Sequence, residues 1–181
     1  KENKLDNEID NLPDGKESKE GLTFHPFKLI IGVVIGFFLL YEDWELLLSF
    51  AIVFFLHELG HVIVGKSFGC VIEEMQVFLL SFVSYKPKYD NDSSSWKNIK
   101  WSLGTLPLGG FTTFKTLSIE SKTAWQRLLI FAGGIKFNFA TFFILYFFTS
   151  YLPSGWYDIC NKIMILSLII AVLNILPIFP L

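Results

Sequence analysis

The motif His57-Glu58-Leu59-Gly60-His61 lies inside an apolar run from Leu46 to Val64 and constrains the fold more than any other feature. As a helix, a run of about 20 residues is roughly 30 Å long and can cross a bilayer. His57 and His61 would then lie on one face, where both imidazoles can bind one metal ion, with Glu58 placed to take a proton from water. Ionisable groups are costly to bury in lipid, so the pattern predicts a functional metal site in a membrane helix.

The composition also favours a membrane protein. Apolar residues make up 52% of the 181 residues, and 20 residues are Phe, many of them in long apolar runs. The sequence shows no basic face interleaved with aromatic residues, so nucleic acid is not expected as a partner. Cys70 and Cys160 are too few and too widely spaced for a disulfide framework or a cysteine zinc site.

The chain divides into a polar arm and an apolar core. Residues 1–22 are rich in charged and amide side chains and predict a disordered arm, and residues 23–181 predict one membrane-embedded core. The core holds four apolar segments, at about 27–41, 46–65, 128–152 and 163–181. We therefore expect a membrane protein that is mainly α, with about four transmembrane helices.

The region between the second and third apolar segments has a different pattern. Val71–Tyr85 and Ile99–Lys115 are rich in β-branched and aromatic residues and are separated by turn-forming residues. They predict a membrane-associated β-hairpin or small sheet. The same region, from Lys66 to Arg127, carries most of the positive charge outside the arm, so the positive-inside rule puts the N-terminal arm and the active-site face in the cytoplasm.

Taken in order, these pieces resemble the site-2 protease family of membrane-embedded zinc metalloproteases. The His-Glu-x-x-His motif is similar to the family's first ligand motif, and Leu106-Pro107-Leu108-Gly109-Gly110-Phe111 is similar to the Gly-Gly stretch of its membrane-associated hairpin. Ala124–Arg127 with Ala132–Asn138 resembles the start of the next core helix, and Asn174–Leu181 resembles the approach to the third ligand. The resemblance covers roughly residues 46–181.

The resemblance implies a role for each matching residue. His57 and His61 would bind Zn²⁺, and Glu58 would be the general base. Asn138 and Asn174 would hold the substrate backbone, although each could instead make an ordinary bond between helices. The strand at Gly109 and Gly110 would pair with an unfolded substrate, although a plain hairpin turn is an equal alternative.

Departures from the family pattern set further expectations. The family's third ligand is an Asp, expected here just after Leu181, and Asp158, Glu73 and Glu74 are not convincing replacements. Gly134 stands where many members have Pro, a change expected to be tolerated. The short interval between the last two apolar segments leaves no room for the PDZ module that some members carry.

The resulting hypothesis is an integral, multi-pass zinc metalloprotease whose partners are the lipid bilayer and membrane protein substrates. It would cut peptide bonds in or near their transmembrane segments. The main alternative is an inactive relative that binds membrane helices without cutting them. A membrane zinc protease with a Glu as third ligand fits the Gly-Gly and Asn-x-x-Pro stretches less well, and a metal transporter would need ionisable residues on more than one span.

Overall fold

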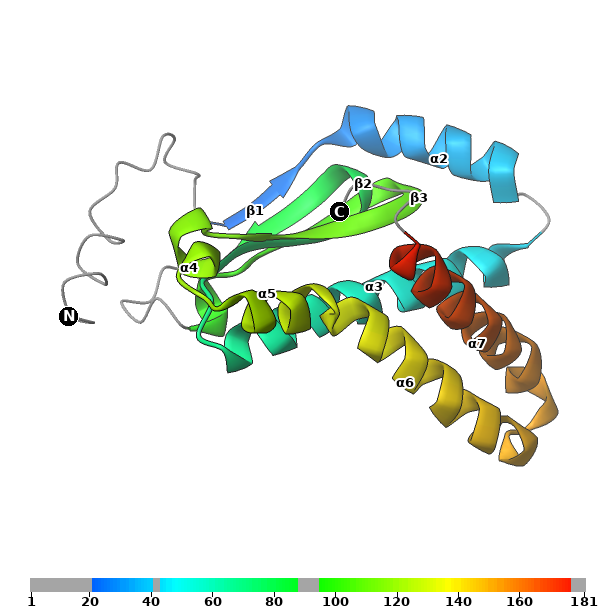
Figure 1. The fold of residues 1–181 in the computed structure, drawn as a ribbon. Helices are drawn as coiled ribbons and strands as arrows, with labels where there is room; N and C mark the ends of the chain where they lie inside the picture. Colours follow the sequence, from blue (N-terminus) through cyan, green and yellow to red (C-terminus); the bar gives the residue numbers. More distant parts are fainter. Residues whose placement is uncertain (1–20, 41–42, 88–94, 177–181) are drawn as a thin grey trace.

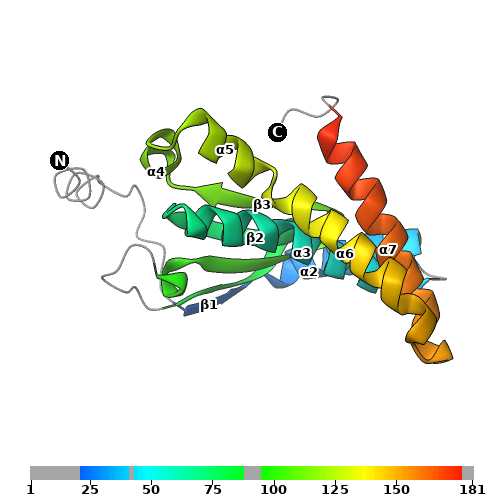
Figure 2. The same ribbon diagram turned by 60° about the horizontal axis from the view of Figure 1, so that its bottom comes forward.

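A computed structural model describes residues 21–40, 43–87 and 95–176. The elements follow in the order β1 (Gly21–Phe24), α2 (Pro26–Leu40), α3 (Trp44–Ser67), β2 (Ile72–Lys86), η1 (Trp96–Asn98), β3 (Lys100–Phe114), α4 (Thr116–Glu120), α5 (Ala124–Phe131), α6 (Gly133–Phe148), η2 (Thr149–Tyr151) and α7 (Ser154–Ile175). Figures 1 and 2 show the strands gathered on one side of α3, while α6 and α7 lie side by side and extend away from the sheet.

Helix α3 is the central element, and it carries the His-Glu-x-x-His motif. It has 24 residues, and the Asp43 carboxylate caps its start by accepting a hydrogen bond from the Leu46 N–H at 3.0 Å. One face packs against the sheet through a cluster that includes Val62. Another face packs against α6 and α7 through a cluster that includes Val53. The apolar run therefore forms a helix that the sheet covers on one side and α6 and α7 cover on another.

The expected small sheet between the second and third apolar segments is confirmed, and it contains three strands instead of two. β1, β2 and β3 form one antiparallel sheet in that order. Met75 in β2 pairs with Thr112 on one side and with Trp101 on the other, so β3 flanks this part of β2 twice. Phe78 and Leu80 have φ values of 66° and 56°, and these two residues mark the bend. The Gly-Gly part of β3 lies against α3, because a Cβ on Gly110 would come within 3.0 Å of Glu58 Cγ.

The number of candidate spans is smaller than the expected four. Within the described residues, α3 and α7 are long and apolar enough to cross a membrane. A third span exists if α5 and α6–η2, which meet at a bend of 43°, are counted as one. The first apolar segment forms α2, whose 15 residues give a helix about 22 Å long, shorter than a bilayer core requires.

Helix α2 lies against the sheet instead (Figure 1). Gly32 lies so close to Thr105 on β3 that an added Cβ would stand 1.7 Å from the Thr105 Cβ. The Thr105 hydroxyl also donates to the Lys28 carbonyl at 3.2 Å. Gly32 therefore lets α2 pack closely on a strand of the sheet.

The N-terminal arm falls mostly outside the described residues, which begin at residue 21. Gly21 and Leu22, the last two residues assigned to it, belong to β1 and pair with Lys86 and Tyr85 of β2. The sequence pattern did not predict β1, which forms one edge of the sheet.

Large apolar side chains cover the outer surfaces of α6 and α7. On α6, Phe143, Ile144 and Phe147 are each more than half exposed, and Ile165 and Ile169 on α7 are nearly so. A soluble protein rarely exposes such a continuous apolar surface, whereas a bilayer covers it. The exposed faces of the two longest helical elements beyond α3 are consistent with contact with lipid.

Candidate metal centre

His57 and His61 project from one face of α3 and bring two ring nitrogens together. Their Nε2 atoms are 3.3 Å apart, and their ring centroids are 4.9 Å apart with the planes at 74°. Two nitrogens bound to one tetrahedral zinc at about 2.0–2.1 Å would be about 3.3–3.4 Å from each other. The separation and chemistry of the pair therefore fit a zinc ion.

The other nitrogen of each ring is held by a different helix. His61 Nδ1 lies 3.0 Å from the Ile130 carbonyl oxygen on α5, and because a carbonyl can only accept, this nitrogen carries the hydrogen. His57 Nδ1 lies 3.0 Å from Asn138 Nδ2 on α6. Contacts of this kind orient metal-binding histidines and fix their tautomers.

The Glu58 side chain points from α3 toward β3 and contacts Gly110 and Thr112 of that strand. Its carboxylate accepts a hydrogen bond from the Thr112 hydroxyl, with 2.8 Å between Oγ1 and Oε2, and the side chain is 5% exposed. Gly110 leaves room for it, because a Cβ at that position would come within 3.0 Å of Glu58 Cγ and 3.1 Å of Oε1. The carboxylate is thus packed between two residues of one strand.

Helices α3 and α6 contact each other at two glycines, Gly60 and Gly133. A Cβ on Gly60 would lie 2.6 Å from the Gly133 carbonyl oxygen, and a Cβ on Gly133 would lie 2.6 Å from the Gly60 carbonyl oxygen. At Gly134 a Cβ would lie 2.6 Å from the Nε2 atoms of both His57 and His61. The start of α6 therefore lies directly on the histidine pair, and position 134 faces the space where their nitrogens converge.

The described residues supply only part of a ligand set. Among them, no group of three or more His, Cys, Asp or Glu side chains could hold a metal ion. A catalytic zinc takes three protein ligands. Within the described residues, the histidine pair offers two nitrogens close enough together to share one ion.

Five of the seven residues predicted from sequence meet here, namely His57, Glu58, His61, Gly110 and Asn138. Gly109, next to Gly110, has a φ of 115°, which glycine adopts readily. Asn174 lies on α7, and its amide donates to the Ile170 carbonyl of the same helix at 2.8 Å.

Sequence reasoning missed Thr112, Ile130 and the contact between Gly60 and Gly133. Thr112 could have been found, because it lies two residues after Gly110, and alternate residues of a strand share a face. The Ile130 carbonyl is a backbone group that every residue type carries, so the sequence pattern could not predict its contact with His61.

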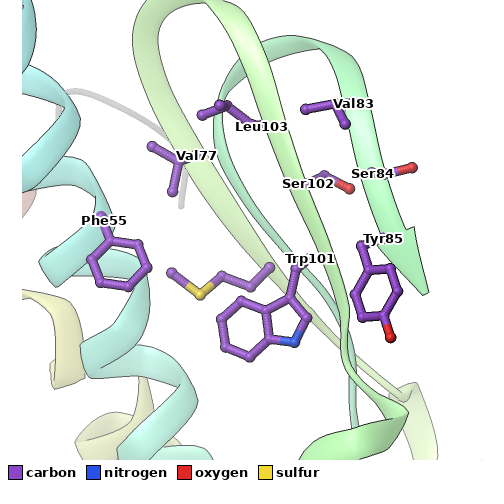
Figure 3. A pocket seen from close by; sticks show the side chains of 9 residues that line it. Phe55, Val77, Val83, Ser84, Tyr85, Trp101, Ser102 and Leu103 are labelled. Carbon is purple, nitrogen blue, oxygen red and sulfur yellow. The ribbon is translucent and has the colours of Figure 1, made fainter. Parts of the chain in front are cut away.

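A separate pocket lies between α3 and the sheet. It has a volume of about 260 Å³ and is lined by residues that include Phe55, Met75, Tyr85 and Trp101 (Figure 3). Its lining contains no His, Asp, Glu or Cys. The pocket therefore offers none of the usual side-chain metal ligands, whereas the histidine pair offers two ring nitrogens.

Fold and site together define a helical membrane protein with a His-Glu-x-x-His metal motif held between a helix and a small sheet. Residues 45–163, about two thirds of the chain, match the model of peptidase family M50. The chain belongs to this family, and its resemblance to the site-2 proteases is thereby confirmed. The match includes every residue of the cluster around the histidine pair and ends before Asn174.

Individual relatives agree with the family match. The chain is 27% identical over 107 residues to a Fusobacterium nucleatum protein and 29% identical over 108 residues to one from Clostridium perfringens; both are provisionally named zinc metalloproteases. These matches cover 55% of this chain in each case. The chain spans about three tenths of the length of these curated relatives, with 29% and 30% of them aligned.

Proposed function

We propose that this protein is an intramembrane zinc metalloprotease that hydrolyses peptide bonds in or near the transmembrane segments of membrane proteins. The observation that carries the proposal is the 3.3 Å separation of the His57 and His61 Nε2 atoms beside the buried Glu58. Membership of family M50 supports it, and so do the names of the relatives.

In this proposal His57 and His61 hold Zn²⁺ through their Nε2 atoms, with a third protein ligand from outside the described residues. When bound, zinc supplies Lewis acidity that makes water easier to deprotonate and polarises a peptide carbonyl. The Glu58 carboxylate accepts the proton of the attacking water and later returns it to the leaving amine. Thr112 and Gly110 hold that carboxylate between α3 and β3.

The substrate would bind as an extended chain beside the Gly-Gly strand. A transmembrane helix has to open before cleavage, because its carbonyls are already hydrogen-bonded and shielded. Pairing with the strand at Gly109 and Gly110 would satisfy the amide groups that opening exposes. Asn174, and Asn138 in the role implied by the family, would contribute side-chain amides to the same purpose.

The proposed orientation places the arm and the active-site face in the cytoplasm. The motif lies in the second half of α3, and the helix ends at Lys66 and Ser67. Further lysines follow in the sheet region, including Lys86, Lys97 and Lys100. This charge distribution supports a cytoplasmic position for the end of α3 that carries the histidines.

The proposal is tested by Glu58→Gln in the full-length protein reconstituted with a membrane-protein substrate. Glutamine keeps the size of the side chain and an oxygen for Thr112 but cannot accept the proton. We expect zinc content to stay at the wild-type level while cleavage falls by at least a thousandfold. Cleavage at the wild-type rate by this variant would contradict the role of Glu58.

The main alternative is an inactive protein that binds membrane helices. It is favoured by the presence of only two ligand residues in the described part of the site. Wild-type protein that binds substrate helices but neither retains zinc nor cuts them would support this alternative over the protease.

A further inference from the structure

The Asn138 side chain has one buried atom with no partner. Asn138 is completely buried on α6, and its Nδ2 lies 3.0 Å from His57 Nδ1. Its Oδ1 has no hydrogen-bond partner among the described residues. A buried polar atom in this condition costs about 1–3 kcal/mol, a cost that an apolar side chain at this position would avoid.

With Nδ2 of Asn138 toward His57, the contacts place one hydrogen on each histidine ring. An amide that donates from Nδ2 requires a lone pair on His57 Nδ1, so the ring hydrogen is on Nε2. That hydrogen points to His61 Nε2 at 3.3 Å. His61 Nε2 can accept it, because the hydrogen of His61 is on Nδ1 and donates to the Ile130 carbonyl.

Metal binding is incompatible with this network at one point. A metal ion between the two rings needs a lone pair on both Nε2 atoms. His61 already meets this requirement, but the hydrogen of His57 has to move to Nδ1. The N–H of His57 would then face the N–H of the Asn138 amide, which is a repulsive contact.

Rotation of the amide removes the conflict. The oxygen and the nitrogen of an asparagine amide occupy equivalent positions, so a half turn exchanges them without a change in packing. The unpartnered Oδ1 would then accept the hydrogen of His57 Nδ1. The half turn gives Oδ1 a partner and sets the tautomer that metal binding needs, and the place without a partner then holds Nδ2.

We propose that Asn138 is a positioning residue for the metal centre, and that its amide rotates when the metal binds so that Oδ1 accepts a hydrogen bond from His57 Nδ1. This inference rests on the proposed zinc site. It assigns Asn138 a role different from the substrate binding that the family resemblance implies, and the two roles have different experimental consequences.

The test measures zinc affinity of the full-length protein by competition with a chelator, without any substrate. Asn138→Leu removes the acceptor while keeping the size of the side chain, and we expect zinc to bind about 10–100-fold more weakly. Asn138→Asp keeps an acceptor oxygen, so its affinity should stay within a few fold of wild type. Thr141→Val is the matched control, because Thr141 lies one turn further along α6 and its hydroxyl donates to the Phe137 carbonyl of its own helix.

The outcomes separate the two roles and the two proposals. If Asn138→Leu binds zinc as tightly as wild type while the KM for substrate rises, the positioning role is overturned and substrate binding is supported. If wild-type protein itself binds no zinc, the proposed function fails and the inference fails with it. Failure of the inference alone leaves wild-type zinc binding intact.

A second measurement needs no variant and so does not depend on how variants fold. Nitrogen-15 NMR of histidine side chains reports which ring nitrogen carries the hydrogen, and these 181 residues contain only three histidines. We expect the His57 hydrogen on Nε2 in metal-free protein and on Nδ1 after zinc is added. A hydrogen already on Nδ1 in the metal-free protein would overturn the proposed rotation.

Discussion

The Thr112 hydroxyl on β3 donates a hydrogen bond to the Glu58 carboxylate on α3, with 2.8 Å between Oγ1 and Oε2. This bond joins the His-Glu-x-x-His helix to the strand that follows the Gly-Gly stretch. Glu58 is buried and Thr112 is half-buried, so water has limited access to the contact. The strand therefore fixes the direction in which Glu58 points.

Removing this hydroxyl should impair catalysis more than binding. Thr112→Val keeps the shape of the side chain but leaves the carboxylate without its donor. A hydrogen bond to a charged group contributes about 1.5–3 kcal/mol, so we expect kcat to fall by tenfold or more with KM nearly unchanged. The measurement is cleavage of a membrane substrate by purified, reconstituted protein.

Two further variants make that result interpretable. Thr112→Ser restores a hydroxyl and should recover most of kcat. Thr113→Val, on the opposite side of the strand where the hydroxyl makes only a 3.5 Å contact with the Glu74 carbonyl, should behave like wild type. A Thr112→Val enzyme with unchanged kcat would show that Glu58 is held by other contacts.

The contact between Gly60 and Gly133 gives a prediction about stability. An added methyl group at either position would meet a carbonyl oxygen at 2.6 Å, so α3 and α6 would have to separate. Overpacking of this kind costs about 1–3 kcal/mol. We expect Gly60→Ala and Gly133→Ala to lower the midpoint of thermal unfolding in detergent and to weaken zinc binding.

Gly155 is the natural control for these two substitutions. It lies in the first turn of α7, and a Cβ there would meet nothing within 4 Å. Gly155→Ala should leave zinc binding unchanged and should raise stability slightly, because alanine favours helix more than glycine does. Equal effects at all three positions would mean that loss of helix packing is not the cause.

The sequence predicted the centre of the site better than its surroundings. The spacing of His57 and His61 was sufficient, because a helix places residues four apart on one face whatever surrounds it. The β-branched and aromatic residues predicted the strands, but no sequence feature predicted the bend at Phe78 and Leu80. A backbone with positive φ at two large residues depends on tertiary contacts that no local pattern encodes.

The count of spans shows a different limit. Hydropathy alone cannot distinguish a helix that crosses a bilayer from one that lies on a sheet, and α2 is apolar enough for either. What separates them is length and the contact between Gly32 and Thr105, which joins residues 73 positions apart in the chain. The contact between Thr112 and Glu58 likewise joins residues 54 positions apart, although the spacing of Thr112 from Gly110 pointed to the same face of the strand.

Cys70 provides a test of the packing between α3 and β2. The thiol is completely buried, and burial raises its pKa above the ordinary value of 9.0, so little reactive thiolate is present at pH 8. In a Cys160→Ser background, we expect Cys70 to resist alkylation by maleimide until the protein unfolds. Mass spectrometry of time points in rising denaturant measures the transition.

An exposed position nearby supplies the comparison. Ser67 ends α3 three residues before Cys70, and its side chain is exposed. In a background without other cysteines, Ser67→Cys should react within minutes under native conditions. Rapid modification of Cys70 in the folded protein would show that the turn between α3 and β2 opens independently of the core.

The last prediction concerns acid stability and the opposite end of α3. The Lys162 ammonium on α7 lies 2.7 Å and 2.9 Å from the two Asp43 carboxylate oxygens and 2.9 Å from Glu45 Oε2. The hydrogen bond from Lys162, with help from the Leu46 N–H, lowers the pKa of Asp43 below its ordinary value of 3.8. The ionised carboxylate therefore stabilises the folded state.

The direction of the pH dependence follows from that shift. A carboxyl group whose pKa is lower in the folded than in the unfolded protein contributes stability above the unfolded value of 3.8, and the contribution disappears as the pH falls through the lower folded value. Asp43→Asn keeps an oxygen for the helix cap and removes only the charge. We expect Asp43→Asn to unfold at a lower temperature than wild type at pH 7, with the two midpoints converging below about pH 4.

Asp158→Asn, at an exposed position on α7, is the control and should follow wild type throughout. If the midpoints of wild type and Asp43→Asn differ by the same amount at pH 7 and at pH 3, the ion pair with Lys162 does not contribute to stability.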